Sequence, residues 1–157
     1  LVITSPFGPR PRRMPGTGLP GPLHPGIDCS CIVGQPVYAV ADGDVARSYC
    51  SWSDPPEAKP GQPRPVSWPA ASAWPRAMGF GECVWLVLPT GQTVVYAHLS
   101  RRLVEAGEHV KRGQCIGLAG TTGYSSGVHL HLEVRENRGY HDPAPLFAHL
   151  VPSPLHL

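Results

Sequence analysis

Residues Gly127-Val128-His129-Leu130-His131-Leu132-Glu133-Val134 alternate between polar and apolar side chains. This alternation predicts a β-strand, because successive side chains of a strand point to opposite faces of its sheet. His129, His131 and Glu133 then share one face, and the apolar residues between them pack on the other. Two histidines on one face of a short strand favour a metal or catalytic site over a packing role.

The length and composition of the chain indicate a single all-β domain over residues 1–157. The sequence contains 18 glycines and 20 prolines. These disfavour long helices and favour short strands joined by turns. No apolar run is long enough to span a membrane. With a formal net charge of +2 and no basic run, the chain lacks the charge pattern of a nucleic-acid-binding protein.

Further strands are expected around the first one. Asp42-Gly43 predicts a hairpin between strands at 37–40 and 44–48, and the turn 89–92 predicts a second hairpin between strands at 82–88 and 93–99. A short strand follows at 115–118. In the strand at 93–99, Val94, Tyr96 and His98 are expected on one face, with Tyr96 a packing residue. Leu146 and Phe147 should pack on the outside of the sheet.

Residues 51–79 interrupt this pattern with many prolines and with Trp52, Trp68 and Trp74. We expect a long insertion loop that is ordered by its own contacts or that forms a docking surface for a partner. Cys50 and Cys83 flank the loop, and a disulfide between them would stabilise the fold by about 3–4 kcal/mol. The other cysteines, Cys29, Cys31 and Cys115, leave the disulfide pattern open, including the alternative that all five are thiols.

Two further segments carry metal-ligand side chains. In His24-Pro25-Gly26-Ile27-Asp28, Pro25-Gly26 predicts a turn that brings His24 and Asp28 together. A catalytic zinc site needs three protein ligands of the N/O type and one open position for water. His24, Asp28 and one histidine of the strand at 127–134 supply such a set. The other strand histidine and His98 remain for polarising a carbonyl or moving a proton.

The remaining polar side chains are assigned ordinary roles. A single histidine is more often a hydrogen-bonded surface or core residue than a ligand, and the tryptophans are explained by packing. Glu133 is expected to form a salt bridge or cap the sheet, in preference to a role in supporting a metal ligand. The histidines interpreted as surface residues are His109, His141, His149 and His156.

Three ordered motifs resemble the signature of the lysostaphin/LytM-type zinc metallopeptidases, peptidase family M23. They are His24-Pro25-Gly26-Ile27-Asp28, Tyr96-Ala97-His98-Leu99-Ser100 and the segment from Gly123 to Glu133, supported by weaker matches such as Phe7-Gly8-Pro9-Arg10. The resemblance runs from Ser5 to Pro143. Val128 stands where the family usually has Pro, and the 51–79 insertion is unusually long.

The resemblance implies a division of roles. His24, Asp28 and His131 would bind zinc, and His98 and His129 would be the catalytic histidines. The implied fold is an antiparallel sheet core of the LytM-like, duplicated hybrid motif type, with a groove walled by loops. The implied activity is hydrolysis of cross-bridge or stem-peptide bonds of bacterial peptidoglycan.

The resemblance also implies a place of action, namely outside the cell or in its envelope, as a periplasmic, wall-bound or virion-associated protein. The chain starts at Leu1, which we interpret as a mature domain or fragment whose targeting signal has been removed. The alternative hypothesis is a zinc-braced module that binds cell wall or serves in an assembly without cleaving a peptide.

Overall fold

The computed structural model describes residues 2–10, 23–50, 79–137 and 139–147. Within this part of the chain, strands dominate and the single helix, α1, has four residues. None of the described helical segments is long and apolar enough to cross a membrane. The elements, in chain order, are β1 (Ile3–Ser5), β2 (Gly8–Pro9), β3 (Leu23–His24), β4 (Gly26–Ser30), β5 (Pro36–Tyr38), β6 (Gly43–Cys50), β7 (Glu82–Val87), β8 (Thr93–Arg102), β9 (His109–Val110), β10 (Cys115–Ala119), β11 (His129–Glu136), β12 (Gly139–His141) and α1 (Ala144–Phe147).

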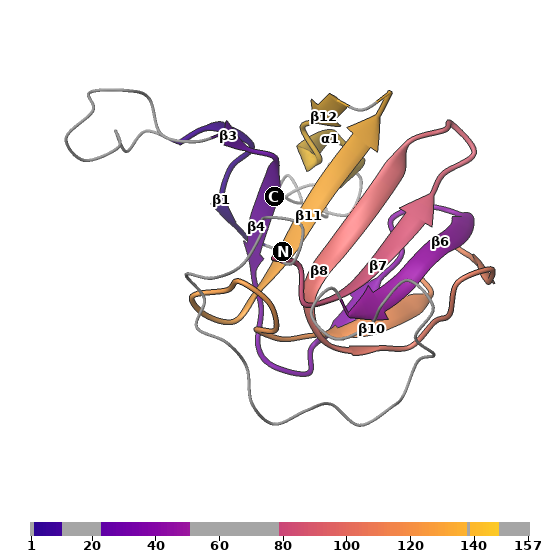
Figure 1. Cartoon of the computed structure of the whole chain (residues 1–157), viewed down its shortest axis with the longest axis horizontal. Coiled ribbons are helices and arrows are strands. Elements are labelled where there is room, and N and C mark those ends of the chain that lie inside the picture. Colours follow the sequence, from indigo (N-terminus) through magenta and orange to yellow (C-terminus); the bar gives the residue numbers. More distant parts are fainter. Residues whose placement is uncertain (1, 11–22, 51–78, 138, 148–157) are drawn as a thin grey trace, which may run out of the picture.

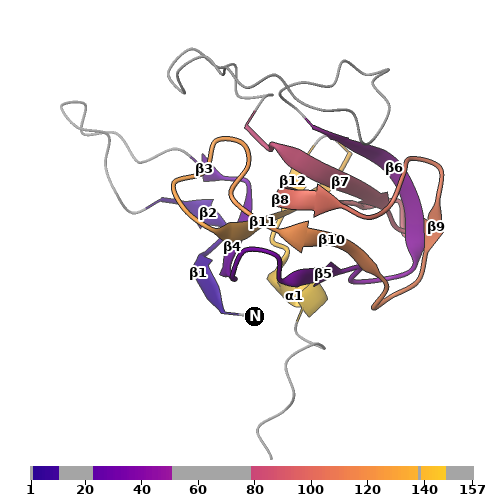
Figure 2. The same ribbon diagram turned by 90° about the horizontal axis from the view of Figure 1, so that it is seen from below.

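The strands form one large antiparallel sheet and one small one (Figure 1). The large sheet has the order β1-β4-β11-β8-β7-β6-β9, so β11 lies between β4 and β8. β10 pairs with β8 and β5, and β12 pairs with the C-terminal end of β11. The small sheet joins β2 to β3. Figure 2 shows β10 between β8 and β5, its two partners in the sheet. The prediction of an all-β antiparallel fold is confirmed.

The core lies on one face of the large sheet. Leu130, Leu132 and Val134 of β11 are buried there and pack in the same cluster as Val94 and Tyr96 of β8. The hydroxyl of Tyr96 is satisfied because it accepts a hydrogen bond from the Val40 N–H at 3.0 Å. Leu146 and Phe147 of α1 pack against this cluster while remaining partly exposed. The period-2 alternation of β11 therefore separates a packing face from a polar face, as predicted.

One predicted hairpin forms and the other does not. β7 and β8 pair on either side of the turn at 89–92, as expected. β5 and β6, however, pair with different partners: β5 with β10, and β6 with β7 and β9. The prediction of a hairpin at Asp42-Gly43 was therefore wrong. The carboxylate of Asp42 instead accepts hydrogen bonds from the backbone N–H of Arg112 and from Lys111 Nζ, which ties this connection to the segment after β9.

The predicted Cys50–Cys83 disulfide is also wrong. In the ladder between β6 and β7, Cys83 lies opposite Tyr49, whereas Cys50 lies opposite Glu82. Side chains of neighbouring residues in a strand point to opposite faces, so this register turns the two thiols apart. All five cysteines are thiols in this structure. The predicted insertion loop lies, except for Gly79, outside the described residues.

The close pairing of β4 and β11 depends on Gly26, which lies opposite Glu133 in the ladder. A Cβ atom at position 26 would come within 2.1 Å of the Leu132 carbonyl oxygen. We therefore expect Gly26→Ala to lower the free energy of unfolding by about 1–3 kcal/mol, the usual range for overpacking. Gly127→Ala is the matched control, because no atom lies within 4 Å of a Cβ there. Equal urea-denaturation midpoints for the two variants would contradict this packing.

Candidate active site

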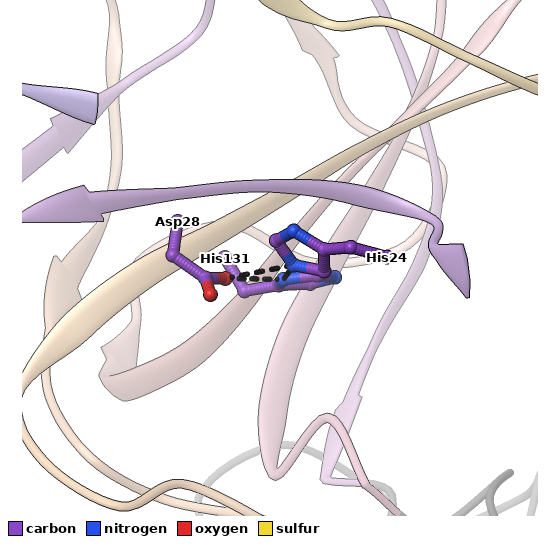
Figure 3. A group of neighbouring side chains, drawn as sticks. All are labelled: His24, Asp28 and His131. Carbon is purple, nitrogen blue, oxygen red and sulfur yellow. Dashed lines mark hydrogen bonds and ion pairs between the residues drawn. The ribbon is translucent and has the colours of Figure 1, made fainter. Parts of the chain in front are cut away.

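Three side chains from separate strands meet on the polar face of β11 (Figure 3). His131 of β11 and Asp28 of β4 lie directly opposite each other in the ladder, and His131 Nδ1 is 2.7 Å from Asp28 Oδ1. His24 of β3 places its Nε2 3.2 Å from the same oxygen and 3.4 Å from His131 Nδ1. These ligand atoms lie within 4.8 Å of one another, a spacing that could hold a metal ion.

In His24 and His131, the ring nitrogen that faces away from Asp28, here called the outer nitrogen, already contacts an oxygen of the protein. His24 Nδ1 lies 2.8 Å from the Pro6 carbonyl oxygen and 3.4 Å from the Ser5 hydroxyl. His131 Nε2 lies 3.1 Å from Glu133 Oε1. A carbonyl or carboxylate oxygen in this position selects the tautomer with its proton on the outer nitrogen. The other nitrogen of each ring faces Asp28, where it is placed to bind a metal once it is unprotonated.

His24 and Asp28 come together, but not through the turn predicted at Pro25-Gly26. Gly26 already belongs to β4, and Pro25 alone separates β4 from β3. β3 pairs with β2 in the small sheet, whereas β4 pairs with β1 and β11 in the large one. The two residues are brought together because the chain passes from one sheet to the other at Pro25, which has no N–H to donate to a ladder.

His98 reaches the site through a β-bulge. The ladder between β7 and β8 pairs Glu82 with Leu99 but Val84 with Tyr96, so β8 has one extra residue between these pairs. His98 has a φ of 62°, a left-handed conformation that is uncommon for a side chain with a Cβ. Its side chain consequently leaves the face of Tyr96. The prediction that His98 shares a face with Val94 and Tyr96 was wrong, because a bulge inverts the alternation and re-aims the side chain.

His98 and His129 complete the cluster. Their ring centroids are 4.7 Å apart, and the His98 ring centroid is 5.7 Å from that of His131. His98 Nδ1 lies 2.7 Å from the Thr122 carbonyl oxygen, and His129 Nδ1 lies 2.8 Å from that of Gly127. His129 Nε2 is 3.7 Å from Asp28 Oδ1. All five residues predicted for the site are thus brought to one place.

The electrostatics of the cluster favour a charged Asp28 and a neutral His98. Burial alone would raise the pKa of Asp28, but hydrogen bonds with His131 and His24 outweigh it and hold that pKa far below its usual value. Burial would lower the pKa of His131, yet its bonds to Asp28 and Glu133 raise it. For His98, burial and the neighbouring His129 lower the pKa to about 4.

Two residues that contact the cluster, Arg10 and Phe80, were not anticipated from the sequence. Arg10 Nη2 lies 3.7 Å from Asp28 Oδ2, and the only signal for it was its place in the weaker motif Phe7-Gly8-Pro9-Arg10. Phe80 stacks on the His131 ring with centroids 6.2 Å apart, and its carbonyl oxygen accepts the N–H of His98 at 2.8 Å. No sequence pattern marked Phe80, because it directly follows the insertion.

The two other histidines in the described part of the chain, His109 and His141, are not in this cluster. His109 contacts Asp44 at 2.8 Å and His141 lies 3.8 Å from Glu136, both at the exposed surface. This agrees with their interpretation as surface residues. His149 and His156 lie outside the described residues.

Comparison with known proteins identifies the family. Residues 66–143 match the model of peptidase family M23. The chain belongs to this family. M23 relatives include an uncharacterized metalloprotease of Haemophilus influenzae, 38% identical over 86% of this chain and 23% of its own length. The peptidoglycan DD-endopeptidase ShyC of Vibrio cholerae is 33% identical over 90% of this chain and 26% of its own length.

A solved structure shares the fold. The zinc-containing peptidase from Vibrio cholerae matches with a TM-score of 0.65 at 31% identity, over 89% of this chain and 35% of that one. The present chain spans about a quarter of the length of the two curated relatives named above. The resemblance inferred from the three sequence motifs is confirmed at the level of the family and the fold.

The neutral state of His98 can be measured in the metal-free protein. Because its pKa is lowered to about 4, we expect its ring to stay neutral down to about pH 5. The unfolded chain binds more protons at this ring between pH 4 and 6.5, so this group makes stability rise with pH across that window. Histidine ring NMR shifts followed between pH 4 and 8 test this. A His98 midpoint near 6.5 would contradict the burial described above.

Proposed function

We propose that this protein is a zinc-dependent endopeptidase that hydrolyses peptide bonds of bacterial peptidoglycan, in its cross-bridges or stem peptides. The observation that carries the proposal is the convergence of five side chains, of which three suffice for a metal ion. ShyC, a relative, is named as a peptidoglycan DD-endopeptidase, and the matched Vibrio cholerae structure is named as a zinc-containing peptidase. These names support both parts of the proposal. The proposed place of action is the cell wall, from the extracellular or envelope side.

His24, Asp28 and His131 are the proposed zinc ligands. Two imidazole nitrogens and one carboxylate oxygen form a donor set typical of catalytic zinc, which keeps a fourth position open. The outer nitrogens of His24 and His131 are held by Pro6 and Glu133, so the donor atoms of the two histidines are oriented before a metal binds. Bound zinc would lower the pKa of its water to about 7 and polarise the scissile carbonyl.

His98 and His129 are the proposed catalytic histidines. Each directs Nδ1 to a backbone carbonyl oxygen, which leaves Nε2 for the substrate side. A neutral His98 offers the lone pair of Nε2 and can accept a proton. His129, at the end of β11, is placed to hydrogen-bond the developing oxyanion or to return a proton to the leaving amine. Neither ring is needed as a ligand if the three proposed ligands and water fill the metal site.

Substitutions separate metal binding from catalysis. We expect His24→Ala, Asp28→Ala and His131→Ala to lose bound zinc and all hydrolysis. His98→Ala and His129→Ala should keep stoichiometric zinc and lose about 10²–10⁴-fold in rate, the usual contribution of general acid–base catalysis. Zinc content by mass spectrometry, together with cleavage of purified peptidoglycan, cross-linked stem peptides and a glycine-rich peptide, measures both effects. Circular dichroism checks that each variant is folded.

The same experiment distinguishes a zinc-braced binding or assembly module. Such a module would bind peptidoglycan equally well after His98→Ala or His129→Ala, and the zinc-loaded wild type would cleave none of the three substrates. That combination would refute the enzymatic proposal.

A further inference from the structure

A second buried network lies behind His131, on the side away from Asp28. It runs along β11 from His131 through Glu133 to Arg135, whose side chains share the polar face because they are two residues apart. We propose that Glu133, held by Arg135, is a positioning residue that fixes the His131 ring so that Nδ1 faces the metal. This inference rests on the proposed role of His131 as a zinc ligand.

The two oxygens of Glu133 have separate partners. Oε1 lies 3.1 Å from His131 Nε2. Oε2 accepts from both Nε and Nη2 of Arg135, at 2.7 and 2.6 Å. Glu133 is only 2% exposed. A buried carboxylate is costly unless it is paired and hydrogen-bonded, and here the guanidinium occupies one oxygen while the other remains for the imidazole.

Arg135 is in turn held by aromatic rings from β7, from β12 and from the turn before β7. Its guanidinium carbon lies 4.6 Å from the centre of the Trp85 ring, 5.2 Å from that of Tyr140 and 5.5 Å from that of Phe80. Tyr140 is directly opposite Arg135 in the ladder of β11 and β12. Cation–π contacts of this kind hold the planar guanidinium against the rings and restrict its rotation. The rings therefore fix Arg135, which orients Glu133.

The network supplies what a metal-ligating histidine requires. A second hydrogen bond on the outer nitrogen sets the tautomer and ring orientation, and its loss commonly weakens metal binding by about 10–100-fold. His24 makes this bond to a backbone carbonyl oxygen, which side-chain substitutions do not remove. His131 makes it to a side-chain carboxylate, so its orientation depends on Glu133 and Arg135. Phe80 stacks on His131 as well as on Arg135 and closes the network.

The test is zinc affinity, measured without substrate by competition with a chromogenic chelator. We expect Glu133→Ala to weaken zinc binding by about 10–100-fold. Glu133→Gln keeps an acceptor oxygen for His131 Nε2 and should recover part of the loss. Arg135→Lys keeps the charge but loses the two-donor contact and the stacking. Its zinc affinity should therefore lie between that of Glu133→Gln and that of the wild type. The visible spectrum of the Co²⁺-substituted protein should change in Glu133→Ala, as expected for a reoriented ligand.

Glu82→Gln is the matched control, because Glu82 is equally buried at 2% and is paired with Arg102 rather than with a proposed ligand. It should lower stability and leave zinc affinity unchanged. Wild-type zinc affinity in Glu133→Ala would overturn the inference, provided that His131→Ala has lost zinc. If His131→Ala also binds zinc normally, the proposed ligand set fails instead. Should Glu133→Ala not fold, wild-type affinity and an unchanged cobalt spectrum in both Glu133→Gln and Arg135→Lys would overturn the inference.

Discussion

The β-bulge at Ala97 and His98 is the constraint on which the arrangement of the site depends. A regular β8 would direct His98 into the core beside Tyr96, and a polar ring there would need a buried partner. The extra residue and the left-handed φ of His98 place its ring beside His129 instead. A strained backbone of this kind costs about 1–3 kcal/mol. It is held by two hydrogen bonds, from His98 N–H to the Phe80 carbonyl and from the His98 ring to the Thr122 carbonyl.

The four histidines are oriented by different kinds of partner. Backbone carbonyl oxygens of Pro6, Thr122 and Gly127 hold three of the rings, whereas His131 is held by the carboxylate of Glu133. In every ring one nitrogen is engaged by the protein and the other faces the cluster. These contacts fix the orientation of the four rings before any ligand is present, as metal binding and proton transfer both require.

The sequence predicted the residues of the site better than their geometry. The alternation in β11 predicted its two faces, and the three motifs predicted which side chains would meet. Local patterns could not predict the bulge, because the extra residue in β8 is visible only in its register with β7. The Asp42-Gly43 hairpin failed for a related reason: pairing of β5 with β10 and of β6 with β9 is set by long-range packing. The salt bridge predicted for Glu133 forms with Arg135, but its partner and its contact with His131 needed the structure.

The five side chains of the site divide, as proposed, into three zinc ligands and two catalytic histidines. The most direct measurement is the coordination sphere of the zinc-loaded protein, by crystallography at high resolution or by X-ray absorption. We predict one zinc per chain, bound by His24 Nε2, Asp28 Oδ1 and His131 Nδ1, with water in the fourth position. A sphere closed by His98 or His129 in place of water, or one that lacks His131, would contradict the account.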